Sequence, residues 1–239
     1  MVELEFEDGL AVVTIDRPHA RNAIDLDTMG ELEKALDAAA DARALAVTGA
    51  GEKAFVSGGD LKELARLRTE PEAADMALRM RAVCDRIAAF PGPVLAALNG
   101  HALGGGAEVA VAADIRVAAD DVRVGFNQSR LAIVPAWGGA ERLARLVGPG
   151  RALLLAGTGR VLDAAEAERL GLVDLVLPRA EFQAGWREVA RALATPQSFE
   201  IKNLTTRTRT PREAAAAFAR LWVSDEHWQA AEKVMSRGK

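Results

Sequence analysis

The chain has 239 residues, half of them hydrophobic, which is enough for one α/β core with a helical appendage. Its net charge of −4 predicts no nucleic-acid partner and no anionic membrane partner. The one cysteine excludes a disulfide framework, and the three histidines lack metal-ligand spacing, so no metal is expected. The N-terminus does not have the pattern of a signal peptide and no apolar run reaches the length of a membrane span, so we expect a soluble cytoplasmic protein.

The N-terminal part of the chain predicts strands followed by a helix. Residues 4–6 and 10–15 have the pattern of a β-hairpin, with Asp8-Gly9 as its turn. Apolar residues at helical spacing predict a helix over residues 29–40, and residues 44–47 predict a short buried strand.

Capping residues and prolines mark the elements that follow. Asp60 is placed to cap a helix over residues 61–67, and Pro71 stands in the first turn of a long helix that runs to Ala89. The remaining predictions are strands over residues 94–98, 115–117, 122–125 and 172–177, a helix over residues 107–113, mostly helix over residues 135–170, and helices over residues 180–239 with breaks near 195–196 and 210–211. Alternating strands and helices followed by helices alone predict an α/β fold, with a layered core over residues 1–179 and a helical C-terminal region over residues 180–239.

The most informative segment is residues 101–108, which read HALGGGAE. Three glycines join an apolar strand to the start of a helix, where backbone N–H groups are unpaired and can hold a developing negative charge. Glu108 follows at once and is placed to move a proton beside that charge, although an acid in a first helical turn is also favoured by the helix dipole alone.

A second glycine segment, residues 54–64, reads AFVSGGDLKEL and also joins a strand region to a helix start. Two such loops can each supply one N–H to the oxygen of a thioester carbonyl as it becomes an enolate, and loss of one oxyanion donor typically costs about 3–4 kcal/mol. The triple glycine at residues 104–106 does not have the glycine spacing of a dinucleotide or phosphate loop. The two loops therefore favour chemistry on a carbonyl oxygen.

Four segments in this order and spacing resemble the enoyl-CoA hydratase/isomerase (crotonase) superfamily over nearly the whole chain. They are residues 15–23 (IDRPHARNA), 54–64, 99–108 (NGHALGGGAE) and 134–143 (VPAWGGAERL). The resemblance implies a crotonase-type ββα spiral core with a helical C-terminal oligomerisation region. It also implies a coenzyme A thioester as the substrate, no other cofactor, and a homotrimer or a dimer of trimers.

The resemblance also implies roles for individual residues. Gly59 and Gly105 match the two oxyanion N–H donors, and Glu108 matches the first catalytic glutamate. The implied substrate and coenzyme A contacts are Arg21, Ala23, Ser57, Asp60, Leu61, Gly104 and Pro135. Asp60 is equally explained as a helix N-cap, and Arg21 as a solvated surface cation.

The chain departs from the family pattern at its second catalytic position. Hydratases of the family carry a second glutamate seven residues before the proline that matches Pro135, and here that position is Gln128. Glutamine forms hydrogen bonds but does not transfer protons at neutral pH, so Gln128 is expected to orient the reacting group while Glu108 handles the proton or activates water.

Three functions remain open at this point. The first is an enoyl-CoA hydratase-like lyase that acts through a stabilised thioester enolate. The second is a decarboxylase of methyl- or ethylmalonyl-CoA, because residues 133–139 also resemble the ethylmalonyl-CoA decarboxylase-like branch and loss of CO₂ needs only one proton donor. The third is an acyl-CoA-binding protein without turnover.

Overall fold

The larger of two sheets forms the centre of the fold in the computed structural model, which describes residues 1–206 and 210–236. Its strands follow the order β1 (Val2–Glu7), β2 (Leu10–Ile15), β3 (Ala44–Gly49), β5 (Val94–Leu98), β7 (Ile115–Ala119) and β10 (Leu175–Leu177). β1 and β2 are antiparallel, and every later neighbour is parallel. Asp8 and Gly9 both have positive φ, at 50° and 87°, which confirms the predicted hairpin turn.

A second sheet contains four short strands. They follow the order β4 (Ala54–Val56), β6 (His101–Leu103), β8 (Arg123–Gly125) and β9 (Val161–Asp163). β8 confirms a predicted strand, whereas β9 lies in a stretch expected to be mostly helical. A strand of three residues shows no period of its own, and β9 forms because it pairs antiparallel with β8.

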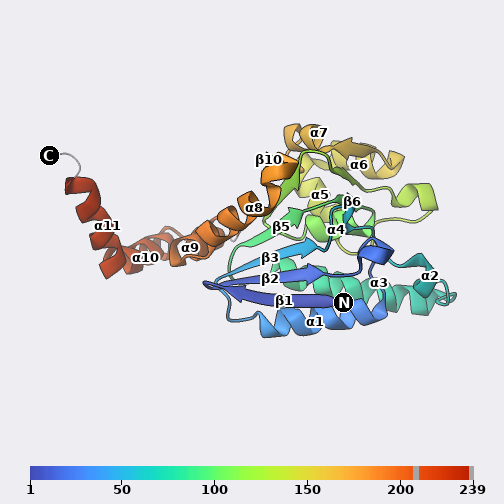
Figure 1. The fold of residues 1–239 in the computed structure, drawn as a ribbon, viewed down its shortest axis with the longest axis horizontal. Helices are drawn as coiled ribbons and strands as arrows, with labels where there is room; N and C mark the ends of the chain where they lie inside the picture. Colours follow the sequence, from blue (N-terminus) through green and yellow to red (C-terminus); the bar gives the residue numbers. More distant parts are fainter. Residues whose placement is uncertain (207–209, 237–239) are drawn as a thin grey trace. The chain divides into compact units, whose positions relative to one another are not determined.

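Eight helices accompany these sheets in residues 1–194. They are α1 (Leu26–Ala38), α2 (Leu61–Leu64), α3 (Glu70–Ala88), α4 (Gly105–Ala110), α5 (Gly139–Val147), α6 (Pro149–Thr158), α7 (Ala164–Arg169) and α8 (Arg179–Leu193). α1 and α3 pack against each other, and α1 contacts β1 and β2 (Figure 1). Asp60 caps α2 as predicted, because its carboxylate accepts from the backbone N–H groups of Lys62 and Glu63.

The first compact unit covers Met1–Ala194 and therefore includes α8. This helix follows the predicted boundary at residue 179, but it belongs with the core because it buries Phe182, Trp186 and Ala190 and contacts β3, β7 and β10. An apolar helix face that covers a sheet is part of that sheet's core.

The second unit begins at Thr195 and its described part is helical. Its helices are α9 (Pro196–Thr206), α10 (Pro211–Trp222) and α11 (Asp225–Ser236), and the two prolines confirm the predicted breaks. Large apolar side chains are exposed along these helices, among them Ile201, Phe218 and Val234. The assembly into trimers or hexamers that the resemblance implies stays a prediction. No helix in the described ranges is long and apolar enough to cross a membrane.

Candidate active site

The triple-glycine segment allows α4 to begin directly against β4. Gly104 has φ 57° and ψ −121°, a conformation that only glycine adopts readily. A Cβ on Gly106 would lie 1.8 Å from the carbonyl oxygen of Val56 in β4, so a side chain at residue 106 would force the two segments apart. The glycines thus keep the two loops in contact.

The backbone N–H groups of Gly59 and Gly105 belong to residues that line one cavity of about 220 Å³. The loops lie close together, since a Cβ on Gly58 would be 3.3 Å from the nitrogen of Gly105. Within the described part of the chain, neither N–H has a hydrogen-bond acceptor. Two unpaired donors therefore border the same small space, as an oxyanion site requires.

Glu108 lies in this cavity's wall with only 2% of its surface exposed. Its Oε2 accepts from the backbone N–H groups of Trp137, at 2.8 Å, and Gly139, at 2.9 Å. Its Oε1 accepts from Nε2 of Gln128 at 2.9 Å. A Cβ on Gly139 would lie 2.3 Å from Cγ of Glu108, so glycine at residue 139 makes this close approach possible.

The environment of Glu108 perturbs its ionisation. Burial raises the pKa of this carboxyl above its ordinary value, while the N–H donors of Gly139, Trp137 and Gln128 offset part of that increase. A carboxyl with a raised pKa is better suited to accept a proton and return it near neutral pH.

Gln128 opens the 3₁₀ helix η2 (Gln128–Leu131) and is buried beside Glu108. Its Oε1 has no hydrogen-bond partner among the described residues, and Gln128 lines the cavity. A buried amide oxygen without a donor is unfavourable, and such groups mark sites that a ligand or water completes. The position found by counting back from Pro135 is therefore next to Glu108.

The other predicted contact residues divide into two groups. Ser57, Leu61 and Gly104 line the cavity with the residues above. Asp60, Ala23, Arg21 and Pro135 lie outside this lining.

Asp60 and Ala23 instead hold a buried arginine that the sequence reasoning missed. The Arg17 side chain, 8% exposed, forms ion pairs with Asp25 at 2.8 Å and with Asp60 at 3.1 Å, and it also donates to the carbonyl oxygen of Ala23. Asp60 thus ties the first glycine loop to the N-terminus of α1, which Asp25 caps. The signal in the sequence is that Asp25 and Asp60 both precede helices. Each caps its helix with one carboxylate oxygen and pairs with Arg17 through the other.

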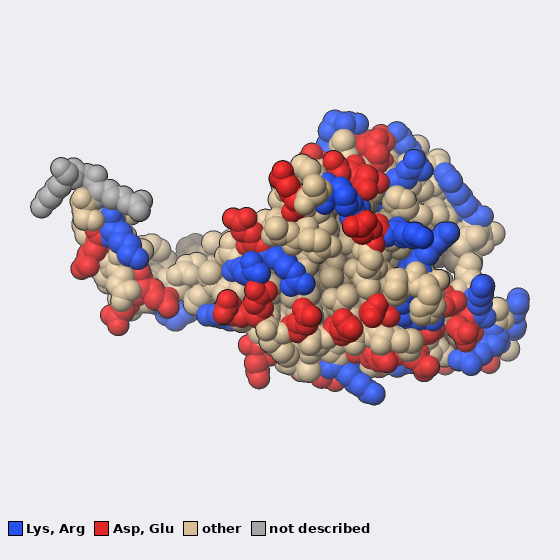
Figure 2. Space-filling view, in the orientation of Figure 1, with Lys and Arg blue, Asp and Glu red and all other residues tan. Residues whose placement is uncertain are grey.

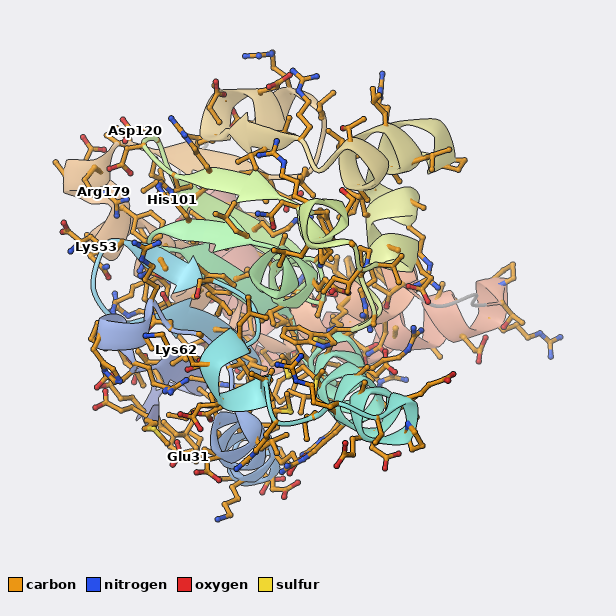
Figure 3. The ribbon with its side chains drawn as sticks, turned by 90° about the vertical axis from the view of Figure 1, so that its right-hand side faces the viewer. Glu31, Lys53, Lys62, His101, Asp120 and Arg179 are labelled. Carbon is orange, nitrogen blue, oxygen red and sulfur yellow. The ribbon has the colours of Figure 1, made fainter. Side chains whose placement is uncertain are left out.

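A neighbouring cavity of about 470 Å³ is bordered by basic side chains and by Glu52 and Asp121, and it shares Ser57 with the first cavity. Its basic residues are Arg21, Lys53, His101 and Arg179, and three of them are labelled together in Figure 3. Acidic and basic side chains are interspersed over the face shown in Figure 2. Arg179 is paired with Asp121, so Arg21 and Lys53 are the cations of this cavity that are suited to an anionic group.

Some site residues could not be identified from side-chain pattern. The N–H donors of Trp137 and Gly139 are backbone groups, and Met76 and Ala77 reach the cavity from α3. In the described ranges, no three His, Cys, Asp or Glu side chains come together as a metal site.

Known proteins share both the sequence and the fold. The family model for enoyl-CoA hydratase/isomerase matches residues 5–231. A short-chain-enoyl-CoA hydratase of Clostridium acetobutylicum is 40% identical over 204 residues, which cover 84% of this chain and 78% of that protein. A crotonyl-CoA hydratase of Syntrophomonas wolfei is 42% identical over 202 residues, which cover 83% of this chain and 77% of that protein.

Solved structures agree with these relatives. The crystal structure of an enoyl-CoA hydratase from Bacillus anthracis has a TM-score of 0.88 at 29% identity and covers 99% of this chain and 96% of that one. The enoyl-CoA hydratase of Thermoplasma volcanium has a TM-score of 0.82 at 31% identity, with 97% and 96% coverage. The predicted crotonase-type fold is confirmed, and the chain belongs to the enoyl-CoA hydratase/isomerase family.

Proposed function

We propose that this protein hydrates the double bond of a short 2-enoyl-CoA, with Glu108 as its single acid–base group. One observation carries the proposal: Glu108 and Gln128 are hydrogen-bonded to each other in one cavity wall, and the amide oxygen of Gln128 lacks a donor. In the proposed arrangement, a water donates one proton to the amide oxygen of Gln128 and the other to the carboxylate of Glu108, so its lone pair is directed away from both residues. Such a water is oriented as a nucleophile.

The proposed reaction needs one proton transfer in each direction. Glu108 accepts a proton from the water while the water oxygen forms a bond to C3 of the enoyl group. The π electrons move onto the thioester oxygen, where the amides of Gly59 and Gly105 stabilise the negative charge. Glu108 then returns the proton to C2, so that one water is added and the carboxylate is regenerated.

The remaining cavity walls support a short, uncharged acyl group. Apolar side chains surround the reacting groups, and they include Leu64, Met76, Leu131 and Trp137. The cavity next to Ser57 offers Arg21 and Lys53 as candidate contacts for the phosphates of coenzyme A. Coenzyme A contacts by Asp60, Ala23 or Pro135 lack this support.

The test is hydration of crotonyl-CoA, followed by the loss of absorbance of the conjugated thioester. We expect turnover by the wild-type protein and a loss of about 100-fold or more in Glu108→Gln, because general acid–base catalysis commonly contributes that much. Equal rates for the two proteins would remove Glu108 from the mechanism. No rate with any enoyl-CoA would reject the hydratase proposal.

Decarboxylation of methyl- or ethylmalonyl-CoA is the second candidate, and the neutral amide of Gln128 favours it. A second glutamate at residue 128 would repel a carboxylated acyl group, whereas glutamine does not. Against it, the described residues that line the cavity include no lysine, arginine or histidine to pair with the substrate carboxylate. Release of CO₂ from these substrates would establish this activity, and thermal stabilisation by acyl-CoA without any turnover would instead indicate a binding protein.

A further inference from the structure

The loop that bonds to Glu108 is contacted by the side chain of Arg142. Residues 135–138 lead into α5, and Trp137 and Gly139 supply two of the three hydrogen bonds that Glu108 accepts. Gly138, between them, has φ 85°, a left-handed conformation that strains most residues. The direction of both N–H groups therefore depends on how this turn is held.

Arg142, one turn into α5, contacts the turn directly. Its Nη1 donates to the carbonyl oxygen of Trp137 at 3.1 Å. A Cβ on Gly138 would lie 2.3 Å from the same nitrogen, so the guanidinium fills the space beside this glycine. This carbonyl belongs to the peptide group between Trp137 and Gly138. The next peptide group along the chain carries the N–H that Gly139 donates to Glu108.

Asp85 on α3 holds the guanidinium in this position. Its Oδ1 lies 2.5 Å from Nη2 of Arg142, and the Arg142 side chain is 12% exposed. Arg142 therefore connects the turn to a long helix whose Met76 and Ala77 line the same cavity. We infer that Arg142 is a positioning residue, which aims the Trp137 and Gly139 amides at Glu108 and so sets its proton affinity. This inference rests on the proposed role of Glu108.

A neighbouring ion pair offers a matched control. Arg81 on α3 pairs with Glu141 on α5 at 2.7 Å, so it links the same two helices without a bond to the turn. Nε of Arg81 also lies 3.7 Å from Oδ2 of Asp85. The ion pairs between α3 and α5 thus involve Arg81, Asp85, Glu141 and Arg142, and the thiol of Cys84 is buried on α3. Arg81 and Cys84 interact electrostatically with Glu108, whereas Arg142 is the one bonded to the turn.

The experiment compares Arg142→Met with Arg81→Met, with Arg142→Lys as a conservative variant. In Arg142→Met we expect weaker hydrogen bonds from the backbone N–H groups to Glu108. These bonds offset the effect of burial, so the pKa of Glu108 should rise further. The acid limb of the kcat profile should move to higher pH, and kcat should fall about 10- to 100-fold. Arg142→Lys should restore part of both, and Arg81→Met, which removes a charge that interacts with Glu108 but no bond to the turn, should change both much less.

A second readout does not require turnover. The Glu108 carboxyl can be titrated by carbon-13 NMR in protein labelled at glutamate, with Glu108→Gln to assign its signal. A larger upward shift in Arg142→Met than in Arg81→Met supports the inference even if the hydratase proposal fails. Equal titration curves for wild type and Arg142→Met would overturn it. If Arg142→Met does not fold, Arg142→Lys, which keeps the positive charge but cannot bond Trp137 and Asp85 through a planar guanidinium, should give a smaller shift in the same direction, and its absence would also overturn the inference.

Discussion

Nε2 of Gln128 donates to Oε1 of Glu108 at 2.9 Å, and this contact fixes which way the amide faces. An ionised carboxylate only accepts, so the NH₂ group must point toward it and the amide oxygen must point elsewhere. Protonation of Glu108 would remove that requirement and allow the amide to turn. The orientation of Gln128 is therefore coupled to the protonation state of its neighbour.

A second carboxylate at residue 128 should make stability depend on pH. In Gln128→Glu, two carboxylates share a buried site and raise the pKa of the pair above the ordinary range. A raised folded-state pKa contributes stability at low pH that is lost as pH rises through it. We expect the Tm of Gln128→Glu to approach that of wild type near pH 4 and to fall well below it at pH 8. An equal Tm deficit at both pH values would contradict this interpretation.

Removal of the charge at residue 108 should stabilise the protein at neutral pH. Burial raises the pKa of Glu108, so its ionisation weakens the fold as pH increases above the ordinary value of 4.5. In Glu108→Gln the side-chain oxygen can still accept from Trp137 and Gly139, and the new NH₂ group can donate to Oε1 of a turned Gln128. We expect a higher Tm than wild type at pH 7 and no such gain below pH 4.5. A Tm below that of wild type at pH 7 would mean that the ionised Glu108 carboxylate does not destabilise the fold.

A methyl group on Gly105 should damage the proposed oxyanion site. A Cβ there would lie 2.2 Å from Cζ3 of Trp137, so either the indole or the backbone must shift. We expect Gly105→Ala to lower kcat/KM about 100- to 1,000-fold, comparable to loss of an oxyanion donor. Gly150→Ala is the control, because a Cβ at Gly150 meets nothing within 4 Å. It should keep full activity and gain about 0.4–1 kcal/mol of stability. Equal kinetics for the two variants would remove Gly105 from the site.

Loss of the buried Arg17 should destabilise the first unit. Arg17→Met leaves Asp25 and Asp60 without their cation, and breaking such a pair costs about 3 kcal/mol or more. Although burial opposes it, the pKa of Asp25 is lowered by hydrogen bonds from Thr28 and by the charge of Arg17. A lowered pKa contributes stability above the ordinary value of 3.8 that is lost as pH falls, so the variant should lose less stability on acidification.

Denaturant unfolding from pH 3 to pH 7 measures both effects. Arg21→Met is the control, since Arg21 is exposed and forms no ion pair within the described residues. It should change the free energy of unfolding by less than about 0.5 kcal/mol. Similar losses in the two variants would mean that the Arg17 ion pairs do not stabilise this unit.

Local chemistry in the sequence predicted much of the fold. The apolar run over residues 94–98 predicted β5, and Pro196 and Pro211 predicted where helices begin, because these signals act within a few residues. β6 and β9 were not predicted because their three residues show no pattern of their own and they are stabilised by strands distant in sequence. Propensity does not describe such long-range pairing.

The candidate site was predictable to the extent that its residues stand in motifs. Glu108, Gln128 and the two glycine loops follow from segment spacing, and the structure gathers them around one cavity. The backbone donors of Trp137 and Gly139 leave no side-chain signal, and Arg142 acts through a carbonyl oxygen. Such contacts depend on the path of the main chain, which a single sequence does not specify.

The indole of Trp137 lies against Gly105 at the wall of the cavity, so the protein contains its own optical probe of ligand entry. Of the four tryptophans, Trp186 is buried in α8, and Trp222 and Trp228 belong to the second unit. Replacing these three by phenylalanine would leave one fluorophore whose emission changes when an acyl group fills the neighbouring space. Equilibrium dissociation constants for saturated acyl-CoA analogues then become measurable by simple fluorescence titration.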